Sequence, residues 1–205
     1  MKILVVGATG VLGQRVVRGL LERGVCVRAV TRAPERASAL QQLGAEVVPG
    51  DLIDRASLAR ACAGVDRVFA AAHGLLGRGR HRSEFVDDQG HRALIDAARA
   101  AGVQRFVYTS AQGAAPDHAV DFYRTKFAIE RHLAASGMPH VILRPTAFME
   151  WHAHNLNGKG VLDKGIAQLI GPGTKKRNFV AADDVAALAM RTLLADEPGE
   201  RLIAI

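Results

Sequence analysis

A glycine-rich turn between an apolar strand and an amphipathic helix opens the chain and constrains its fold most. Lys2 to Val6 read as a buried strand, Gly7-Ala8-Thr9-Gly10-Val11-Leu12-Gly13 follows, and apolar residues then recur at helical spacing as far as Arg23. The G-x-x-G-x-x-G spacing permits a tight turn at Gly7, room for a ligand at the Gly10 backbone, and close helix–strand packing at Gly13. Such a strand–turn–helix unit predicts a dinucleotide-binding βαβ fold.

Strand and helix signals alternate along the rest of the chain. Apolar or β-branched runs predict strands at residues 25–31, 46–48, 67–71, 104–110, 140–143 and 201–205, and helical spacing predicts helices at 34–43, 54–63, 84–101, 120–136 and 185–194. Strands this apolar are typical of a parallel sheet that helices cover on both faces. The sequence therefore predicts a doubly wound, Rossmann-type α/β fold.

One region breaks this alternation. Between Trp151 and Arg177 the periodicity is weak and several glycines occur, so we expect loops over the carboxyl edge of the sheet, where ligands of such folds bind. We predict a single domain over residues 1–205, with residues 146–180 as a small, loop-rich C-terminal region on its substrate side.

The composition is that of an ordinary globular domain, with 49% hydrophobic and 23% charged residues among 205, which excludes wholesale disorder. No apolar run reaches the roughly 18 residues that a membrane span needs, and glycines interrupt the apolar start of the chain too early for a signal peptide. Cys26 and Cys62 are too few for a disulfide scaffold or a metal cluster. We therefore expect a cytoplasmic protein.

The net charge of +7 raises the question of a nucleic-acid partner. The basic residues cluster twice, as Arg78, Arg80, His81 and Arg82 and as Lys175, Lys176 and Arg177. Neither cluster is interleaved with aromatic residues, which make up only 5% of the chain, so a stacking surface for nucleic acid is not expected. We interpret both clusters as solvated loops, with attraction of a phosphorylated ligand as the remaining alternative.

The end of the second predicted strand carries a basic residue where a dinucleotide fold selects its cofactor. Arg32 stands 19 positions after Gly13, and no acid accompanies it. An acid there would bind the ribose 2′-hydroxyl of NAD, whereas a guanidinium suits the 2′-phosphate of NADP. The sequence therefore favours NADP(H) over NAD(H), with Arg36 as a second candidate for the phosphate.

At this point the chain resembles the NmrA-like atypical short-chain dehydrogenases/reductases. The resemblance runs through nearly the whole chain and rests on the order and spacing of its motifs. These are Gly7-x-x-Gly10-x-x-Gly13, Thr31-Arg32, Gly50-Asp51-Leu52, Ala70-Ala71-Ala72, the run from Gly102 to Ser110, Lys126 with Glu130, Leu143-Arg144-Pro145, Phe148-Met149-Glu150, and Val180 to Val185.

The resemblance implies a Rossmann fold with an NADP site along the carboxyl edge of the sheet. It implies adenine contacts at Asp51 and Leu52, adenosine-side contacts from Ala71 to His73, a hydrogen bond from Lys126 to the nicotinamide ribose, and nicotinamide contacts from Pro145 to Phe148. The full expected cofactor set is Gly7, Thr9, Gly10, Val11, Leu12, Gly13, Arg32, Asp51, Leu52, Ala71, Ala72, His73, Thr109, Ser110, Lys126, Pro145, Thr146 and Phe148.

The chain departs from the wider superfamily at its proton donor. Classical members carry a tyrosine four residues before the lysine, but here that position is Phe122, and Tyr123 lies only three before Lys126. One position rotates a helical side chain by about 100°, so Tyr123 could replace the missing donor only if the helix were re-aimed. The usual serine falls at Ala111, with Ser110 one residue early. Lys126, Tyr123 and Ser110 are therefore the candidate catalytic residues.

The lack of a tyrosine four residues before Lys126 limits the substrates that such a site could reduce. A ketone that accepts hydride forms an alkoxide that needs a proton donor, whereas a quinone, flavin or cationic dye delocalises the added charge. We predict an NADPH-dependent oxidoreductase that reduces a conjugated, electron-poor small molecule. The alternative is a non-catalytic NADP(H) sensor that controls a protein partner.

The substrate-side candidates are His118, Trp151 and His152. His152 and His154 are two residues apart, a spacing that does not bring them together on a helix, so no metal site is expected. A homodimer remains an open alternative, because a partner subunit could roof the substrate cleft.

Overall fold

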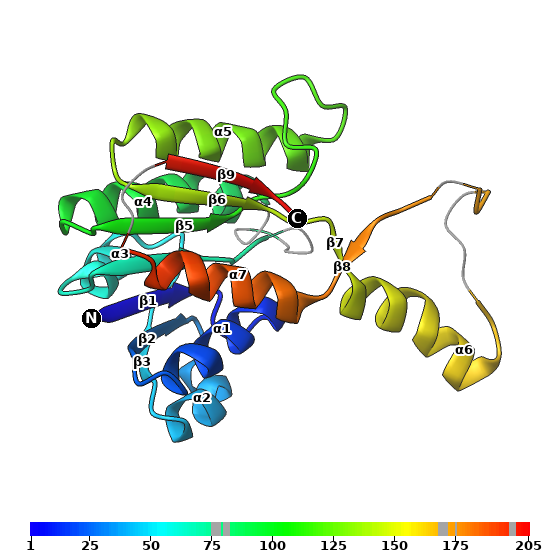
Figure 1. Cartoon of the computed structure of the whole chain (residues 1–205), viewed down its shortest axis with the longest axis horizontal. Coiled ribbons are helices and arrows are strands. Elements are labelled where there is room, and N and C mark those ends of the chain that lie inside the picture. The colour runs from blue at the N-terminus through cyan, green and yellow to red at the C-terminus, as the bar shows by residue number, and fades with distance from the viewer. Residues whose placement is uncertain (75–78, 80–82, 168–171, 175, 197–199) are drawn as a thin grey trace.

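Seven parallel strands form the central sheet of the computed structural model, in the order β3-β2-β1-β4-β5-β6-β9 (Figure 1). The structure describes all residues except 75–78, 80–82, 168–171, 175 and 197–199, and it leaves the side chains of 155–157 and 200 undescribed. The strands are β1 (Lys2–Val6), β2 (Cys26–Thr31), β3 (Glu46–Pro49), β4 (Arg67–Ala70), β5 (Arg105–Thr109), β6 (His140–Arg144) and β9 (Glu200–Ala204). The predicted α/β fold class is confirmed.

The strand order reverses at β1, and this reversal positions the site. β1 pairs with β2 on one side, where Val6 lies opposite Val30, and with β4 on the other, where Val6 lies opposite Ala70. In an open parallel sheet, the chain leaves such a pair of strands in opposite directions, and a crevice forms outside their carboxyl ends. The turn at residues 7–13 and the segment after β4 therefore flank this crevice.

Helices cover both faces of the sheet, because each carries one apolar stripe. One face is covered by α1 (Val11–Leu21), α2 (Ser38–Gln42) and α7 (Ala182–Leu194), and the other by α3 (Arg55–Cys62), α4 (His91–Ala100) and α5 (Asp121–Ala135) (Figure 1). The first core includes Val16 and Val185, and the second includes Leu58 and Leu94, all fully buried.

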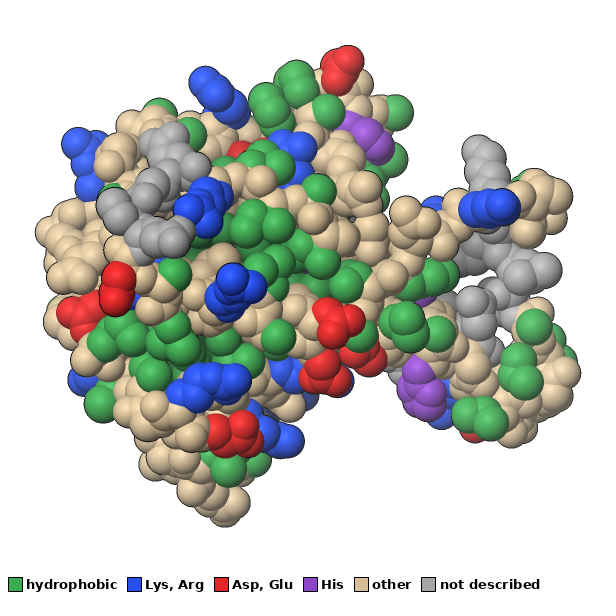
Figure 2. All heavy atoms as spheres, in the orientation of Figure 1, with side chains coloured by type: hydrophobic (Ala, Val, Ile, Leu, Met, Phe, Trp, Pro, Cys, Tyr) green, Lys and Arg blue, Asp and Glu red, His purple; other side chains and the backbone are tan. Residues whose placement is uncertain are grey.

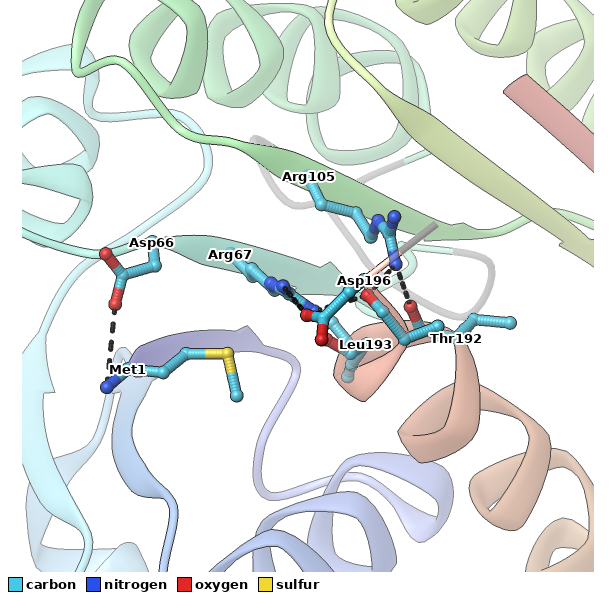
Figure 3. A network of polar contacts seen from close by, with 8 residues as sticks. Met1, Asp66, Arg67, Arg105, Thr192, Leu193 and Asp196 are labelled. Carbon is cyan, nitrogen blue, oxygen red and sulfur yellow. Dashed lines mark hydrogen bonds and ion pairs between the residues drawn. The ribbon is translucent and has the colours of Figure 1, made fainter. Parts of the chain in front are cut away.

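The end of α7 is anchored to the middle of the sheet by two arginines (Figure 3). Arg67 of β4 donates to the carbonyl of Leu193 and, at 2.8 Å, to that of Ala195, while Arg105 of β5 donates at 2.9 Å to the carbonyl of Thr192. Cationic groups at a helix C-terminus satisfy its last carbonyls and favour its dipole. This anchoring holds the first turn of α7 near the carboxyl edge.

Two predicted segments differ from the structure. The helix expected over 84–101 begins as a π-helix, η3 (Glu84–Gly90), before α4, and the helix expected over 34–43 divides into a 3-10 turn, η1 (Pro34–Ala37), and α2. A widened π-helical or tightened 3-10 stretch of one or two turns is too short to change the apolar pattern visibly, so periodicity alone does not reveal it.

The prediction of loops between Trp151 and Arg177 is wrong for its first part. Residues Glu150–Gly158 form a second π-helix, η4, and Lys159–Lys164 form α6, which together project beyond the sheet as an arm (Figure 1). No residue of α6 is buried. A helix with no buried face needs no apolar stripe, which explains why its sequence lacks helical periodicity. The arm is joined to the body by a short parallel pair, β7 (Ala147–Phe148) and β8 (Phe179–Val180).

Two features of the sequence fall partly or wholly outside the described residues. Arg78, Arg80, His81, Arg82 and Lys175 are not described, whereas Lys176 and Arg177 are exposed. Among the residues that are described, no helix is long and apolar enough to cross a membrane, and no group of three or more His, Cys, Asp or Glu side chains could hold a metal ion.

Candidate functional site

The turn from β1 to α1 is fixed by contacts that only glycine allows. Gly7 has a φ of +88°, and a Cβ there would lie 2.7 Å from the backbone nitrogen of Ala72. A Cβ at Gly13 would lie 2.1 Å from the carbonyl oxygen of Gly7. At Gly10 the nearest protein atom would be 3.3 Å away, so the protein itself demands glycine least there. The exposed face of Gly10 is where a ligand can approach the backbone.

The first turn of α1 is open toward this approach. Its N-cap is Gly10, no side chain caps it, and its first turn contains no acid. The backbone N–H groups of a first turn have no partners inside the helix and carry partial positive charge, so they favour an anion. By contrast, Asp54 accepts hydrogen bonds from Ala56 (3.0 Å) and Ser57 (3.2 Å) at the start of α3. The chain leaves α1 uncapped beside the glycine turn.

Beyond the sheet edge, β2 ends in an exposed cation. Thr31 stabilises the turn after β2, because its hydroxyl accepts a hydrogen bond from the Ala33 nitrogen at 3.2 Å. Arg32 and Arg36 are both exposed, and among the described residues Arg32 makes no hydrogen bond or ion pair. Its guanidinium is available to an anionic ligand.

The segments after β3 and β4 line the same crevice. Leu52 is 6% exposed, and Ser57 holds the Asp51 backbone by accepting from its nitrogen at 3.1 Å. Ala71 continues the β4 ladder by donating to the Val6 carbonyl at 2.9 Å, and Ala72 contacts Gly7. His73 is exposed and the following residue, Gly74, is buried.

Lys126 is a buried cation at the carboxyl edge of the sheet. It lies on α5, 3% exposed, and its Nζ donates to the Thr109 carbonyl at 3.3 Å. The same Nζ lies 5.0 Å from the centre of the Tyr108 ring and 5.6 Å from that of Phe122. Burial lowers the pKa of Lys126, and the carboxylates of Asp87 and Glu130 oppose that shift. An ammonium held among aromatic rings is poised to bind an incoming polar ligand in place of water.

Several buried polar atoms on or beside β5, η3 and α4 make no hydrogen bond within the described residues. They are Tyr108 Oη, Thr109 Oγ1, Ser110 Oγ, Asp87 Oδ1 and His91 Nε2, of which Asp87 Oδ1 has Lys126 as its ion-pair partner. Buried polar atoms normally find hydrogen-bond partners, and the Tyr108 ring lies beside both Lys126 and His91. This region is therefore a candidate for completion by a ligand or by water.

Tyr123 packs against His118 and Phe122. Its ring lies 4.3 Å from the ring of His118 and 5.3 Å from that of Phe122, and it faces Gly113. Within α5, the Phe122 ring lies beside Lys126, as expected for residues four apart on a helix. The roles of Tyr123 and Ser110 in catalysis stay predictions.

Glu130, one turn after Lys126, fixes α5 to β6. Its two carboxylate oxygens accept from Arg144 Nε at 2.8 Å and Nη2 at 2.5 Å, a bidentate pair. Glu130 is 4% exposed, and its carboxylate raises the pKa of Arg144. This pair places Pro145, directly after β6, at the same edge as Lys126.

Asp87 is not among the site residues predicted from the sequence. It lies in η3, fully buried, with one carboxylate oxygen 3.9 Å from Lys126 Nζ. A signal was present, because Asp87 stands seven and eleven residues before Leu94 and Ala98 and so belongs to the buried stripe of the predicted helix. A carboxylate in such a stripe needs a cationic or hydrogen-bonding partner.

The predicted substrate-side residues fall into two groups. Trp151 and His152 lie at the start of the arm, where His152 bonds to the Phe148 carbonyl at 3.0 Å and its ring lies 5.7 Å from those of Trp151 and Phe179. His118 contacts Tyr123 on the α5 side instead. Thr146 and Phe148 connect the two regions, and the Thr146 nitrogen donates to the Ile205 carbonyl at 3.0 Å.

Comparison with known proteins matches this arrangement to a family. Residues 1–201 match the model of the NmrA-like family. The chain therefore belongs to the NmrA-like family, and the resemblance inferred from its motifs is confirmed.

Several curated relatives are similar over most of the chain. Sterol demethylase protein B of Methylococcus capsulatus is 35% identical over 228 residues, 99% of this chain and 69% of the relative. The NAD(P)H azoreductase of Xenophilus azovorans is 33% identical over 196 residues, 93% of this chain and 63% of the relative. Photosystem II assembly factor Ycf39 of Cyanophora paradoxa is 30% identical over 204 residues, 98% of this chain and 62% of the relative. The chain thus spans between 62% and 69% of these relatives' length.

Solved structures of two reductases share the fold of this chain. The NADPH-dependent quinone oxidoreductase QOR2 of Escherichia coli, complexed with NADPH, superposes with a TM-score of 0.81 at 27% identity, covering 99% of this chain and 68% of that one. The triphenylmethane reductase of Citrobacter sp. superposes with a TM-score of 0.83 at 25% identity, again covering 99% and 68%. These similarities class the chain with the nicotinamide-dependent oxidoreductases.

Proposed function

We propose that this protein is an NADPH-dependent reductase of a conjugated, electron-poor small molecule of the quinone, flavin or dye type. The observation that carries the proposal is the geometry around Lys126, in which a buried ammonium remains beside the crevice while Phe122 replaces the proton donor. An azoreductase, a quinone oxidoreductase and a dye reductase among the similar proteins support the same substrate class.

The chain's own residues supply binding and orientation. The open first turn of α1 would receive the pyrophosphate, and Arg32 the 2′-phosphate, which makes NADPH the preferred cofactor. Lys126 would hold the nicotinamide ribose, with Pro145, Thr146 and Phe148 beside the ring. Bound NADPH would supply the hydride. A quinone or flavin would spread the added charge and take its proton from water, and a cationic dye would need no proton, so no tyrosine is required.

The substrate would lie between the body and the arm. Trp151 and His152 stand at the start of the arm, and His118 contacts Tyr123 of α5. We propose a location in the cytoplasm and a small molecule as the main partner; nucleic-acid binding is not part of this proposal.

The test is NADPH oxidation with a panel of acceptors at equal concentration: menadione, an azo dye, a triphenylmethane dye and a simple ketone such as acetone. Oxidation with one or more of the first three, above the rate without protein, and none with the ketone supports the proposal. Turnover of the ketone alone would contradict it, because a ketone requires the proton donor that this site lacks.

A second candidate function is a non-catalytic NADP(H) sensor with a protein partner. The similarity to Ycf39 assembly factors favours it, as does the absence of the tyrosine. A sensor would bind NADPH tightly, leave every acceptor in the panel unreduced, and bind its partner differently with NADPH and NADP+.

A further inference from the structure

We propose that Asp87 is the positioning residue for Lys126, and that it couples this lysine to the loop that follows β4. The inference rests on the NADPH site proposed above. The inference goes beyond the proposed cofactor contacts, because Asp87 is not among them. Asp87 is fully buried, on a π-helix that is not part of the sequence motifs described above.

The two oxygens of the Asp87 carboxylate face two different parts of the site. Oδ2 accepts from the Gly74 nitrogen at 3.0 Å and from the Ser83 hydroxyl at 2.6 Å. Oδ1 lies 3.9 Å from Lys126 Nζ and accepts no hydrogen bond among the described residues. One oxygen therefore holds the loop on the proposed adenosine side, while the other faces the proposed nicotinamide side.

The π-helix that carries Asp87 is itself held in place. The His91 ring lies 3.0 Å and 3.1 Å through Nδ1 from the carbonyls of Val86 and Asp87. Burial lowers the pKa of His91 to about 4, so this ring is neutral at pH 7 and donates its single Nδ1 hydrogen to these carbonyls. A Cβ at Gly90 would lie 2.7 Å from the Cβ of Leu52, which fixes η3 against the segment after β3. Single π-helical turns occur often at functional sites.

The negative charge of Asp87 serves as a counter-charge for the buried Lys126 ammonium. An ammonium without a counter-charge would lose its proton on burial, or would turn toward solvent. The Asp87 carboxylate, with a smaller contribution from Glu130, opposes the lowering of the Lys126 pKa by burial, and from 3.9 Å away it directs the ammonium at the carboxyl edge, where Lys126 would meet the ligand.

The test is a double-mutant cycle read by NADPH affinity, with Asp87→Asn, Lys126→Met and the double variant. Asparagine keeps an oxygen for Gly74 and Ser83 but removes the charge. We expect Asp87→Asn to weaken NADPH binding by about 10-fold or more, which is the size of one lost charged hydrogen bond, and to have no further effect when Lys126 is already methionine. Affinity for 2′,5′-ADP, which lacks the nicotinamide ribose, should change less than about 2-fold, since Lys126 faces only the missing half.

Thermal stability supplies a readout that needs no ligand. Lys126→Met leaves the Asp87 carboxylate buried without its cation, so its Tm should fall by roughly 10 °C. Adding Asp87→Asn should recover part of that fall. The matched control is Asp88→Asn, on the next residue of η3, whose half-exposed carboxylate pairs with Arg92 at 2.5 Å; it should leave both readouts near those of the unmodified protein.

A milder variant protects the test if Asp87→Asn does not fold. Ser83→Ala removes one hydrogen bond to Asp87 and should weaken NADPH binding by about 2- to 5-fold, with no further effect in the Lys126→Met background. Equal effects of the Asp87 or Ser83 variants with and without Lys126, or equal losses for NADPH and 2′,5′-ADP, would overturn the proposal. NADPH binding without turnover would overturn the reductase assignment alone, whereas no dinucleotide binding at all would overturn both.

Discussion

The body of the molecule and the arm that projects from it are held in place in different ways. In the body, the turn after β1 is fixed by backbone contacts at Gly7 and Gly13, and α1 and α7 pack on a fully buried face of the sheet. In the arm, α6 has no buried residue, and its Leu162 is 76% exposed. Hydrophobic side chains lie on the surface of the arm (Figure 2).

The base of the arm is tied down by a few polar contacts instead. Glu150 accepts from the Ala182 nitrogen at 2.8 Å, at the start of α7, and lies 3.7 Å from Arg15 of α1. Arg15 also donates to Asp183 at 2.6 Å. The proposed cofactor site is thus built into the packing of the body, whereas the proposed substrate contacts stand on a segment that the core does not fix. Substitutions in the two regions should therefore have separable effects.

The largest effect is expected at the glycine turn. Gly13→Ala places a Cβ 2.1 Å from the Gly7 carbonyl oxygen, and since backbone must move on both sides, we expect a destabilisation above about 4 kcal/mol and loss of NADPH binding. Gly24→Ala is the control, because Gly24 has a left-handed φ of +72°, which Gly13 does not, while the space around Gly24 is open; this variant should cost only about 1–2 kcal/mol. Equal losses of Tm in the two variants would contradict the close-packing argument.

The next largest effect concerns the choice of cofactor. Arg32→Ala should weaken NADPH binding by about 10- to 100-fold, the value of charged hydrogen bonds to a phosphate, and should leave NADH affinity unchanged. Fluorescence titration with both cofactors measures this. Arg131→Ala, at an exposed position of α5, controls for net charge. A parallel loss of NADPH and NADH affinity would show that Arg32 does not read the 2′-phosphate.

A smaller effect is expected at a helix start that the protein caps for itself. Asp54→Ala removes the acceptor for Ala56 and Ser57 and should cost about 1 kcal/mol in the free energy of unfolding, measured in urea. NADPH affinity should not change, because α3 is capped by its own side chain and not by the ligand. Asp54→Asn, which retains an acceptor, should remain within a few tenths of a kcal/mol of the unmodified protein.

The smallest effect on stability is expected in the arm. Trp151 is 38% exposed, so Trp151→Ala should change the free energy of unfolding by less than about 0.5 kcal/mol and leave NADPH affinity unchanged. The KM for the reducible acceptor should rise, which would separate the substrate contact from the cofactor site. Leu162→Ala, on the outer part of the arm, is the control and should leave both the KM for the acceptor and the NADPH affinity unchanged. A fall in NADPH affinity with Trp151→Ala would contradict the division between body and arm.

Local sequence signals predicted the body well because its structure depends on them. The apolar strands, the glycine turn and the apolar stripe of α7 each carry a pattern that packing requires, and the parallel sheet follows. The arm was predicted as loops because an exposed helix leaves no such pattern. Asp87 was missed for a different reason, since its partner, Lys126, lies on another helix, and pairing across the fold is not visible in local periodicity.

The central claim, that bound NADPH reduces a conjugated acceptor in this site, is tested most directly by a single turnover. The protein is saturated with one equivalent of NADPH without oxygen, menadione is added in excess, and the reduced-nicotinamide absorbance is followed. We predict loss of the whole signal at a rate far above that of free NADPH, slowed when the transferred hydrogen of NADPH is replaced by deuterium. Retention of the bound NADPH signal, at the rate seen without protein, would contradict the account and favour the sensor.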